Sequence, residues 1–121
     1  MKKVLLMLCL SAASALNPAQ AALPAAARTE IVQLMATLEK SDCHFNRNGN
    51  WYDGKQAASH LQRKFAYLEE KDMLANAEDF IKKGASESSS SGKPYLVRCQ
   101  DQQEVKSADW FAQQLKKIRG K

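Results

Sequence analysis

The chain has 121 residues, 26% of them charged, and its 18 Lys and Arg outnumber its 13 Asp and Glu. A chain of this length builds one domain with a core of modest size. Acidic and basic residues alternate, as in Glu69-Glu70-Lys71-Asp72, whereas nucleic-acid-binding proteins gather their basic residues on one face. We therefore expect no nucleic-acid partner.

The N-terminus has the three parts of a secretory signal peptide. Lys2-Lys3 gives a positive start, Val4 to Leu10 is an apolar run, and Ala19-Gln20-Ala21 is a small-x-small cleavage site. The apolar run is too short for a membrane span, which needs about 20 apolar residues. We predict that residues 1–21 are removed on export to the bacterial periplasm. Residues 22–121 should then form a single α+β domain with no membrane span and a net charge of +3, since two lysines are lost.

Two cysteines lie beyond the predicted cleavage site, Cys43 and Cys99. An even pair in an oxidising compartment predicts a disulfide, and closing a loop of roughly 55 residues would stabilise the fold by about 4 kcal/mol. The alternative is that Cys43, beside His44, is a reactive nucleophile. A periplasmic thiol with an available partner tends to oxidise, so the disulfide is the prediction.

The first elements expected after the signal peptide are a helix and a β-hairpin. The helix starts at Pro24, which suits a first helical turn, and ends near Ser41-Asp42. Its apolar stripe follows the spacing i, i+3, i+4, i+7 and consists of Ile31, Leu34, Met35 and Leu38. Asn48-Gly49 then favours a type I′ turn. Alternation along the hairpin places Cys43, Phe45, Arg47, Asn50 and Tyr52 on one face, and His44, Asn46, Trp51 and Asp53 on the other.

Two further helices are expected next. Asp53 begins the longer one, with Gln56 as its capping-box partner. The apolar stripe of this helix consists of Ala57, Leu61, Phe65 and Leu68. Asn76 caps a short third helix, which Gly84 ends.

The last third of the chain contains a loop, a strand and a helix. Residues 84–94 include five serines and end in Gly-Lys-Pro, a composition typical of a loop. Tyr95 to Cys99 is a predicted strand, and its inward face should meet the hairpin face that carries Cys43. Gln100 to Lys106 is expected to be a polar connection, and Ser107 is expected to cap the last helix. The predicted order is α-β-β-α-α-β-α. The predicted fold is α+β, with a small antiparallel sheet, made of the hairpin and one late strand, packed with about four helices.

Four spaced motifs run through this chain: Phe45-x-Arg47-Asn48-Gly49, Ala58-x-His60-Leu61-x-x-Lys64, Ala77-Glu78-x-Phe80-Ile81 and Ala85-Ser86-x-Ser88-Ser89-x-x-Gly92-x-Pro94-Tyr95-x-Val97. Together they resemble a family of small exported proteobacterial proteins catalogued as a domain of unknown function, number 5329. The resemblance spans most of the chain beyond the signal peptide. It implies a periplasmic location and a single domain, and it implies no activity.

Polar and basic residues of these motifs make up a candidate binding site. His60 and Lys64 are four residues apart and share one helix face. The hairpin turn and the serine-rich loop add further basic, amide and hydroxyl groups. Such a mixture suits an anion or a carbohydrate. The candidate binding residues are Arg47, Asn48, His60, Lys64, Ser88, Ser89, Lys93 and Tyr95.

Structural roles for the same residues remain open. Turn geometry alone explains Asn48, Arg47 could pair with a helix-end carboxylate, and His60 could bond a neighbouring loop. The serine run could be a solvated linker. Trp51 is a core residue if a helix covers its face of the hairpin, and part of a recognition surface if none does.

We expect a non-enzymatic, monomeric binding or accessory module of the periplasm that recognises an envelope protein, a glycan or a small anion. One alternative is a small hydrolase that uses a loop serine with His60, although no G-x-S-x-G elbow is present. Another is an inhibitor of an envelope-attacking enzyme such as lysozyme, because Ser91-Gly92-Lys93-Pro94-Tyr95 is similar to the Ser-Gly-x-x-Tyr loop of some exported lysozyme inhibitors. We expect no cofactor and no metal, since the sequence has two histidines, His44 and His60, and no H-x-x-x-H or C-x-x-C spacing.

Overall fold

Eight elements follow one another in the computed structural model, which describes residues 22–120. They are α1 (Ala25–Glu39), β1 (Cys43–Arg47), β2 (Asn50–Asp53), α2 (Gly54–Glu70), α3 (Ala77–Gly84), β3 (Leu96–Cys99), β4 (Val105–Lys106) and α4 (Ser107–Ile118). The predicted α+β class is confirmed, whereas the predicted signal peptide, residues 1–21, lies outside the described residues. In the described part, no helix has both the length and the apolar character that a membrane span requires.

The sheet has one strand more than the sequence predicts. Its order is β2-β1-β3-β4, and every neighbouring pair is antiparallel. β4 lies at the end of the segment expected to be only a polar connection, and it pairs with Leu96 and Val97 of β3. The chain turns back on β3 directly after Cys99, where Gln100 adopts a positive φ of 47°. The Gln102 N–H donates to the Cys99 carbonyl and closes this tight turn. The order is therefore α-β-β-α-α-β-β-α.

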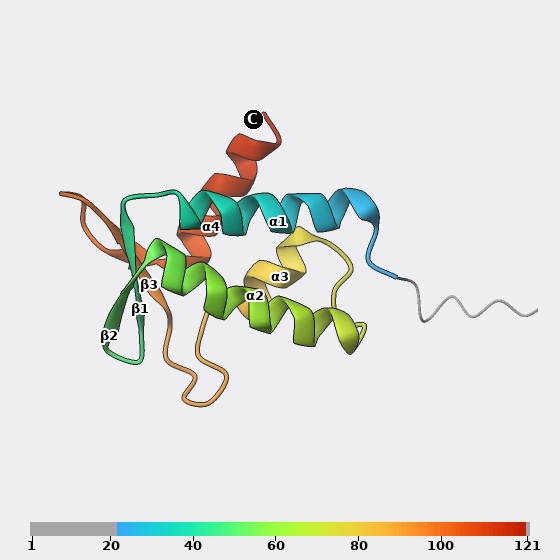
Figure 1. Ribbon diagram of the computed structural model, residues 1–121, viewed down its shortest axis with the longest axis horizontal. Helices are drawn as coiled ribbons and strands as arrows, with labels where there is room; N and C mark the ends of the chain where they lie inside the picture. Colours follow the sequence, from blue (N-terminus) through green and yellow to red (C-terminus); the bar gives the residue numbers. More distant parts are fainter. Residues whose placement is uncertain (1–21, 121) are drawn as a thin grey trace, which may run out of the picture.

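The core lies between the helices and the inner face of the sheet. Figure 1 shows the sheet at one end of the molecule, with α1 and α2 extending from it side by side, and α1 also contacts α3 and α4. Phe45 of β1 and Val97 of β3 are buried on the inner face. The helices bury the predicted apolar stripes, which are Ile31, Leu34, Met35 and Leu38 of α1 and Ala57, Leu61, Phe65 and Leu68 of α2.

The predicted helix caps of α2 and α3 are present. The Asp53 carboxylate accepts a hydrogen bond from the Gln56 N–H at 2.8 Å, and the Gln56 side chain accepts one from the Asp53 N–H at 3.1 Å. Asn76 caps α3 by accepting from the Asp79 N–H. Because Asp53 is also the last residue of β2, the capping box starts α2 directly at the hairpin, so that the hairpin and the first turns of α2 share one surface.

A disulfide joins the hairpin to the late strand. Cys43 lies opposite Cys99 in the β1–β3 pair, and the two sulfurs are bonded. The predicted disulfide is confirmed, and the alternative of Cys43 as a free nucleophile is wrong, because its thiol is consumed in the bond. The hairpin turn is also confirmed: Asn48 and Gly49 have φ values of 54° and 88°, the two positive angles that a type I′ turn requires.

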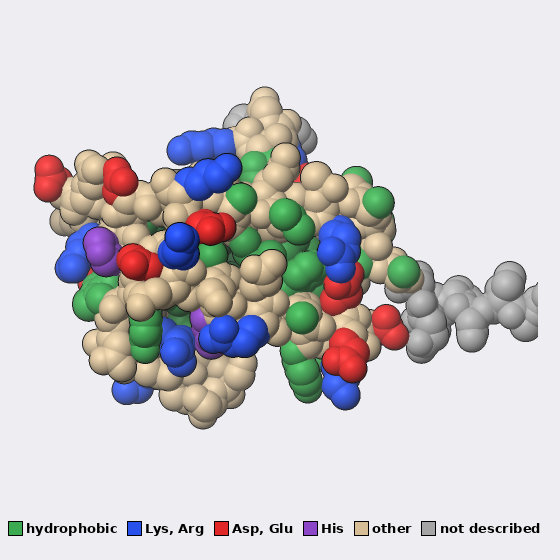
Figure 2. Space-filling model, in the orientation of Figure 1, with side chains coloured by type: hydrophobic (Ala, Val, Ile, Leu, Met, Phe, Trp, Pro, Cys, Tyr) green, Lys and Arg blue, Asp and Glu red, His purple; other side chains and the backbone are tan. Residues whose placement is uncertain are grey.

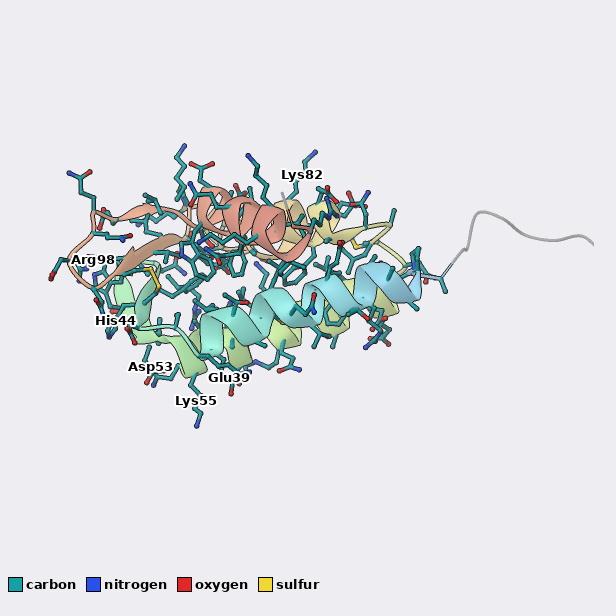
Figure 3. The ribbon with its side chains drawn as sticks, turned by 90° about the horizontal axis from the view of Figure 1, so that it is seen from above. Glu39, His44, Asp53, Lys55, Lys82 and Arg98 are labelled. Atoms are coloured by element: carbon teal, nitrogen blue, oxygen red, sulfur yellow. A yellow bond between two sulfur atoms is a disulfide. The ribbon has the colours of Figure 1, made fainter. Side chains whose placement is uncertain are left out.

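The outer face of the sheet carries Trp51. Figure 3 shows His44 and Arg98, on neighbouring strands, on the side away from the helices. Trp51 shares this face and is partly exposed, with the guanidinium carbon of Arg98 at 4.3 Å from its ring centre. The interpretation of Trp51 as a core residue is wrong, because no helix among the described residues covers this face.

The start of α4 differs from the prediction. Lys106 is the N-cap residue and no side chain caps the helix. The Ser107 hydroxyl is fully buried and has no hydrogen-bond partner within residues 22–120. The prediction that Ser107 caps α4 is wrong, because its N–H donates to the Tyr95 carbonyl at 2.9 Å and thereby draws Ser107 inside the helix, next to the sheet.

Candidate functional site

The hydroxyl of Tyr95 joins two side chains of α2. It lies 3.2 Å from Nε2 of His60 and 3.0 Å from Nζ of Lys64. Nζ of Lys64 also donates to the Glu87 carbonyl at 3.0 Å and lies 4.9 Å from the centre of the Tyr95 ring. Since Tyr95 is only 1% exposed, this cluster of His60, Lys64 and Tyr95 holds the serine loop against α2.

Burial sets the protonation of this cluster. It lowers the pKa of His60 from 6.5 to about 4, with the charges of Arg47 and Lys64 acting in the same direction. Burial also lowers the pKa of Lys64, although the negative charge of Glu87 acts to raise it. Burial raises the pKa of Tyr95. His60 is therefore neutral at pH 7. Because an ammonium group can only donate, Lys64 donates to the Tyr95 oxygen, and the Tyr95 hydroxyl shares its other hydrogen bond with Nε2 of the neutral His60.

A cavity of about 400 Å³ opens beside this cluster, between the hairpin and α2. Three of its side chains are cationic, Arg47, Lys55 and Arg63, and none of the described residues that line it is acidic. The guanidinium of Arg47 lies over the ring of Tyr52, 5.1 Å from its centre. The lining residues are Phe45, Arg47, Tyr52, Lys55, Gln56, Ala57, Ser59, His60 and Arg63. We call this cavity the hairpin cavity.

The serine loop is ordered by its own hydroxyl groups. Ser88 is 4% exposed, and its hydroxyl accepts a hydrogen bond from the Asn48 amide at 3.3 Å. Ser91 donates to the Asn48 side-chain oxygen at 2.6 Å, and the Ser88 N–H donates to the Lys93 carbonyl at 3.0 Å. The loop is thus not merely a solvated linker, because Asn48 of the hairpin turn fixes its position.

The structure separates the predicted binding residues by role. Arg47 and His60 line the hairpin cavity, whereas Lys64 and Tyr95 lie beside it in the buried cluster. Asn48 and Ser88 hold the loop. Ser89 lines a second cavity along α2, described below, and Lys93 is exposed and lines neither.

The sequence prediction missed other lining residues of the hairpin cavity. The missed residues Gln56, Ser59 and Arg63, together with the predicted His60, follow the same i, i+3, i+4, i+7 spacing as an apolar stripe. That polar stripe was the available signal. Hairpin alternation placed Tyr52 on the same face as Arg47, but which helix covers that face depends on the tertiary structure.

The hydrolase alternative requires a serine oxygen close to His60. The described residues show the His60 ring bonded to Tyr95 instead, and no hydrogen bond between His60 and a serine occurs among residues 22–120. In the Ser-Gly-x-x-Tyr segment, Tyr95 is buried whereas Ser91 and Gly92 are exposed.

Figure 2 shows the charged side chains on one face of the molecule. Below α2, blue basic side chains flank a purple histidine. The tan surface below them lies where Figure 1 shows the serine loop. The hairpin cavity brings together cationic groups, a neutral imidazole, hydroxyl and amide groups, and two aromatic rings. Groups of these kinds are suited to anions and to hydroxyl-bearing ligands.

Comparison with known proteins places the chain in one family. An uncharacterised protein, YfeK of Salmonella typhimurium, is 42% identical over 62 residues, which are 51% of this chain and 50% of the relative. The match thus spans about half the length of that curated relative. No solved structure matches the chain. The model of a family of unknown function, DUF5329, matches residues 25–119, which include every described helix and strand, and the chain therefore belongs to this family.

Proposed function

We propose that this protein is exported to the periplasm and acts there as a non-enzymatic module that binds an anionic component of the cell envelope in the hairpin cavity. The observation that carries the proposal is the charge of the lining: Arg47, Lys55 and Arg63 converge on one cavity, and no acidic residue of the described chain lines it. Several cations around one concave surface favour a negatively charged ligand.

The remaining lining residues suit a ligand that also bears hydroxyl groups. His60 is neutral at pH 7 and can bond a hydroxyl without adding charge. Gln56 and Ser59 add neutral donors and acceptors, and Tyr52 offers an aromatic face. A volume of about 400 Å³ lies within the range of small-molecule sites. A single acidic sugar combines these properties.

Isothermal titration with three probes tests the proposal. Galacturonic acid and inorganic phosphate should bind, and galactose, which matches galacturonic acid apart from the carboxylate, should bind at least ~10-fold more weakly, because it loses a charge-assisted hydrogen bond. Raising the salt concentration should weaken the binding of both anions.

A matched pair of variants assigns the binding to the cavity. Lys55→Gln should weaken galacturonic acid by roughly 10-fold, whereas Lys40→Gln, which removes the same charge from an exposed position outside the cavity, should leave the affinity unchanged. Equal affinity for galactose, or equal losses in the two variants, would refute the proposal.

A further inference from the structure

A second cavity of about 410 Å³ continues the hairpin cavity along α2. The two cavities share His60 and Arg63 in their linings. From there the second cavity extends over Lys64 and Tyr67 of α2 to Lys83 of α3 and Ser89 of the serine loop. We call the two cavities together the α2 groove.

The α2 groove is basic along its whole length. Arg47 and Lys55 stand at the hairpin end, Arg63 in the middle and Lys83 at the far end. The charge of Lys64 is offset by nearby Glu87, and Nζ of Lys83 donates to the Met73 carbonyl at 2.7 Å. None of the described residues that line either cavity is acidic. One small anion can meet only part of this row of charges.

The groove is also long and has an aromatic ring near each end. Lys55 and Tyr67 are 12 residues apart on α2, which corresponds to about 18 Å along the helix axis. Tyr52 lies at the hairpin end, and Tyr67, with 57% of its surface exposed, lies at the other. Neutral hydrogen-bonding groups of Gln56, Ser59 and Ser89 lie between or beside the cations.

We propose that the α2 groove binds an acidic glycan chain of several sugars, whose acid groups pair with the row of basic residues and whose rings pack on Tyr52 and Tyr67. This inference rests on the proposed function and extends it from one acidic sugar to a polymer. A glycan fits better than an acidic peptide, because sugar rings pack on the aromatic faces of Tyr52 and Tyr67, and sugar hydroxyls also use the neutral hydrogen-bonding groups between the cations.

Titration with galacturonic acid and with its linear tetramer tests the inference on the full protein. The tetramer should bind at least ~10-fold more tightly than the monomer, because it reaches cations of both cavities. Tyr67→Ala and Lys83→Gln should each reduce the ratio of the tetramer affinity to the monomer affinity at least ~3-fold.

Lys82→Gln is the matched control for Lys83→Gln. Lys82 is the neighbouring residue on α3 and is equally a surface lysine, but it lines a different depression, between α3 and α4. Figure 3 shows Lys82 on the opposite side of the molecule from Lys55. This variant should bind the tetramer as the unaltered protein does. Thermal unfolding of each variant establishes that it is folded.

The outcomes separate this inference from the proposed function. If the monomer binds and the tetramer binds no better, the extended glycan site is wrong and the hairpin cavity remains a site for a small anion. If tetraglutamate binds as tightly as the tetragalacturonate, the assignment to glycans is wrong. If neither monomer nor tetramer binds, both proposals fail.

Discussion

A single hydroxyl group, that of Tyr95, joins two residues of α2 where the serine loop meets this helix. The Tyr95 oxygen accepts a hydrogen bond from Lys64 and shares a second one with Nε2 of His60, whose imidazole is neutral. Burial produces that neutral state by lowering the pKa of His60 to about 4. The same three groups hold the loop carbonyl of Glu87 through Lys64, so the protonation of His60 and the position of the loop are linked.

The low pKa of His60 predicts how stability changes with pH. In the unfolded chain a histidine has a pKa of about 6.5, so between about pH 6.5 and 4 the unfolded state binds more protons than the folded state. The free energy of unfolding should therefore decrease as the pH falls through this window. Urea denaturation at a series of pH values measures the effect, and His60→Gln should flatten the decrease.

His44→Gln is the control for this experiment, because His44 is exposed on the outer face of the sheet. It should retain the pH dependence of the unaltered protein. Glu30 and Glu78, whose pKa values Arg119 lowers, should contribute only below about pH 4.5, where carboxylates begin to protonate. A decrease between pH 6.5 and 4.5 that persists in His60→Gln would contradict the assignment.

At the scale of elements, α2 serves two purposes at once. One stripe of the helix enters the core, and the polar stripe that contains His60 and Arg63 lines the α2 groove. Gly54 at its first turn lets this helix approach the end of α1, because a Cβ atom there would clash with the Leu38 carbonyl oxygen. The missing side chain thus sets where α2, and with it the groove, lies.

Gly54→Ala should destabilise the protein although alanine favours helices. The added methyl group meets backbone atoms rather than a flexible side chain, and such overpacking costs about 1–3 kcal/mol. The midpoint of urea denaturation should fall accordingly. Lys55→Ala, one residue along on an exposed position, should change the free energy of unfolding by less than about 0.5 kcal/mol. Equal stabilities of the two variants would show that α1 yields at this contact.

At the scale of the whole molecule, two kinds of link join distant parts of the chain. Arg119 of the C-terminal segment bonds Glu30 of α1 at 2.8 Å and Glu78 of α3 at 2.7 Å. These ion pairs are partly exposed, and such pairs contribute little each. The disulfide between Cys43 and Cys99 closes a loop of 56 residues, and it is the larger constraint on the unfolded chain.

Removal of the disulfide should cost much of the stability. Replacing Cys43 and Cys99 together by alanine should lower the free energy of unfolding by about 4 kcal/mol, as measured by urea denaturation, and unaltered protein with its disulfide reduced should behave alike.

The intact mass of protein recovered from the periplasm should match residues 22–121 less two hydrogens. A mass that includes residues 1–21, or two free thiols in native protein, would contradict the proposed export and oxidation.

The sequence by itself determined the features that depend on near neighbours. The apolar stripes of α1 and α2, the caps at Asp53 and Asn76, and the turn at Asn48-Gly49 each depend on residues within a few positions of one another. The disulfide followed from the number of cysteines and the expected compartment. It also agreed with strand alternation, which placed both cysteines on inward faces.

Only the tertiary structure decided which distant groups meet. β4 is two residues long, too short for a periodic signal, and exists because β3 offers it an edge. Tyr95 alternated correctly as an inward residue, but its bonds to His60 and Lys64 cross more than 30 positions of the sequence. The α2 groove arises likewise, since the hairpin, α2, α3 and the loop each supply part of its lining. Local preferences specify each element, whereas the packing of their apolar faces sets which polar residues share a surface.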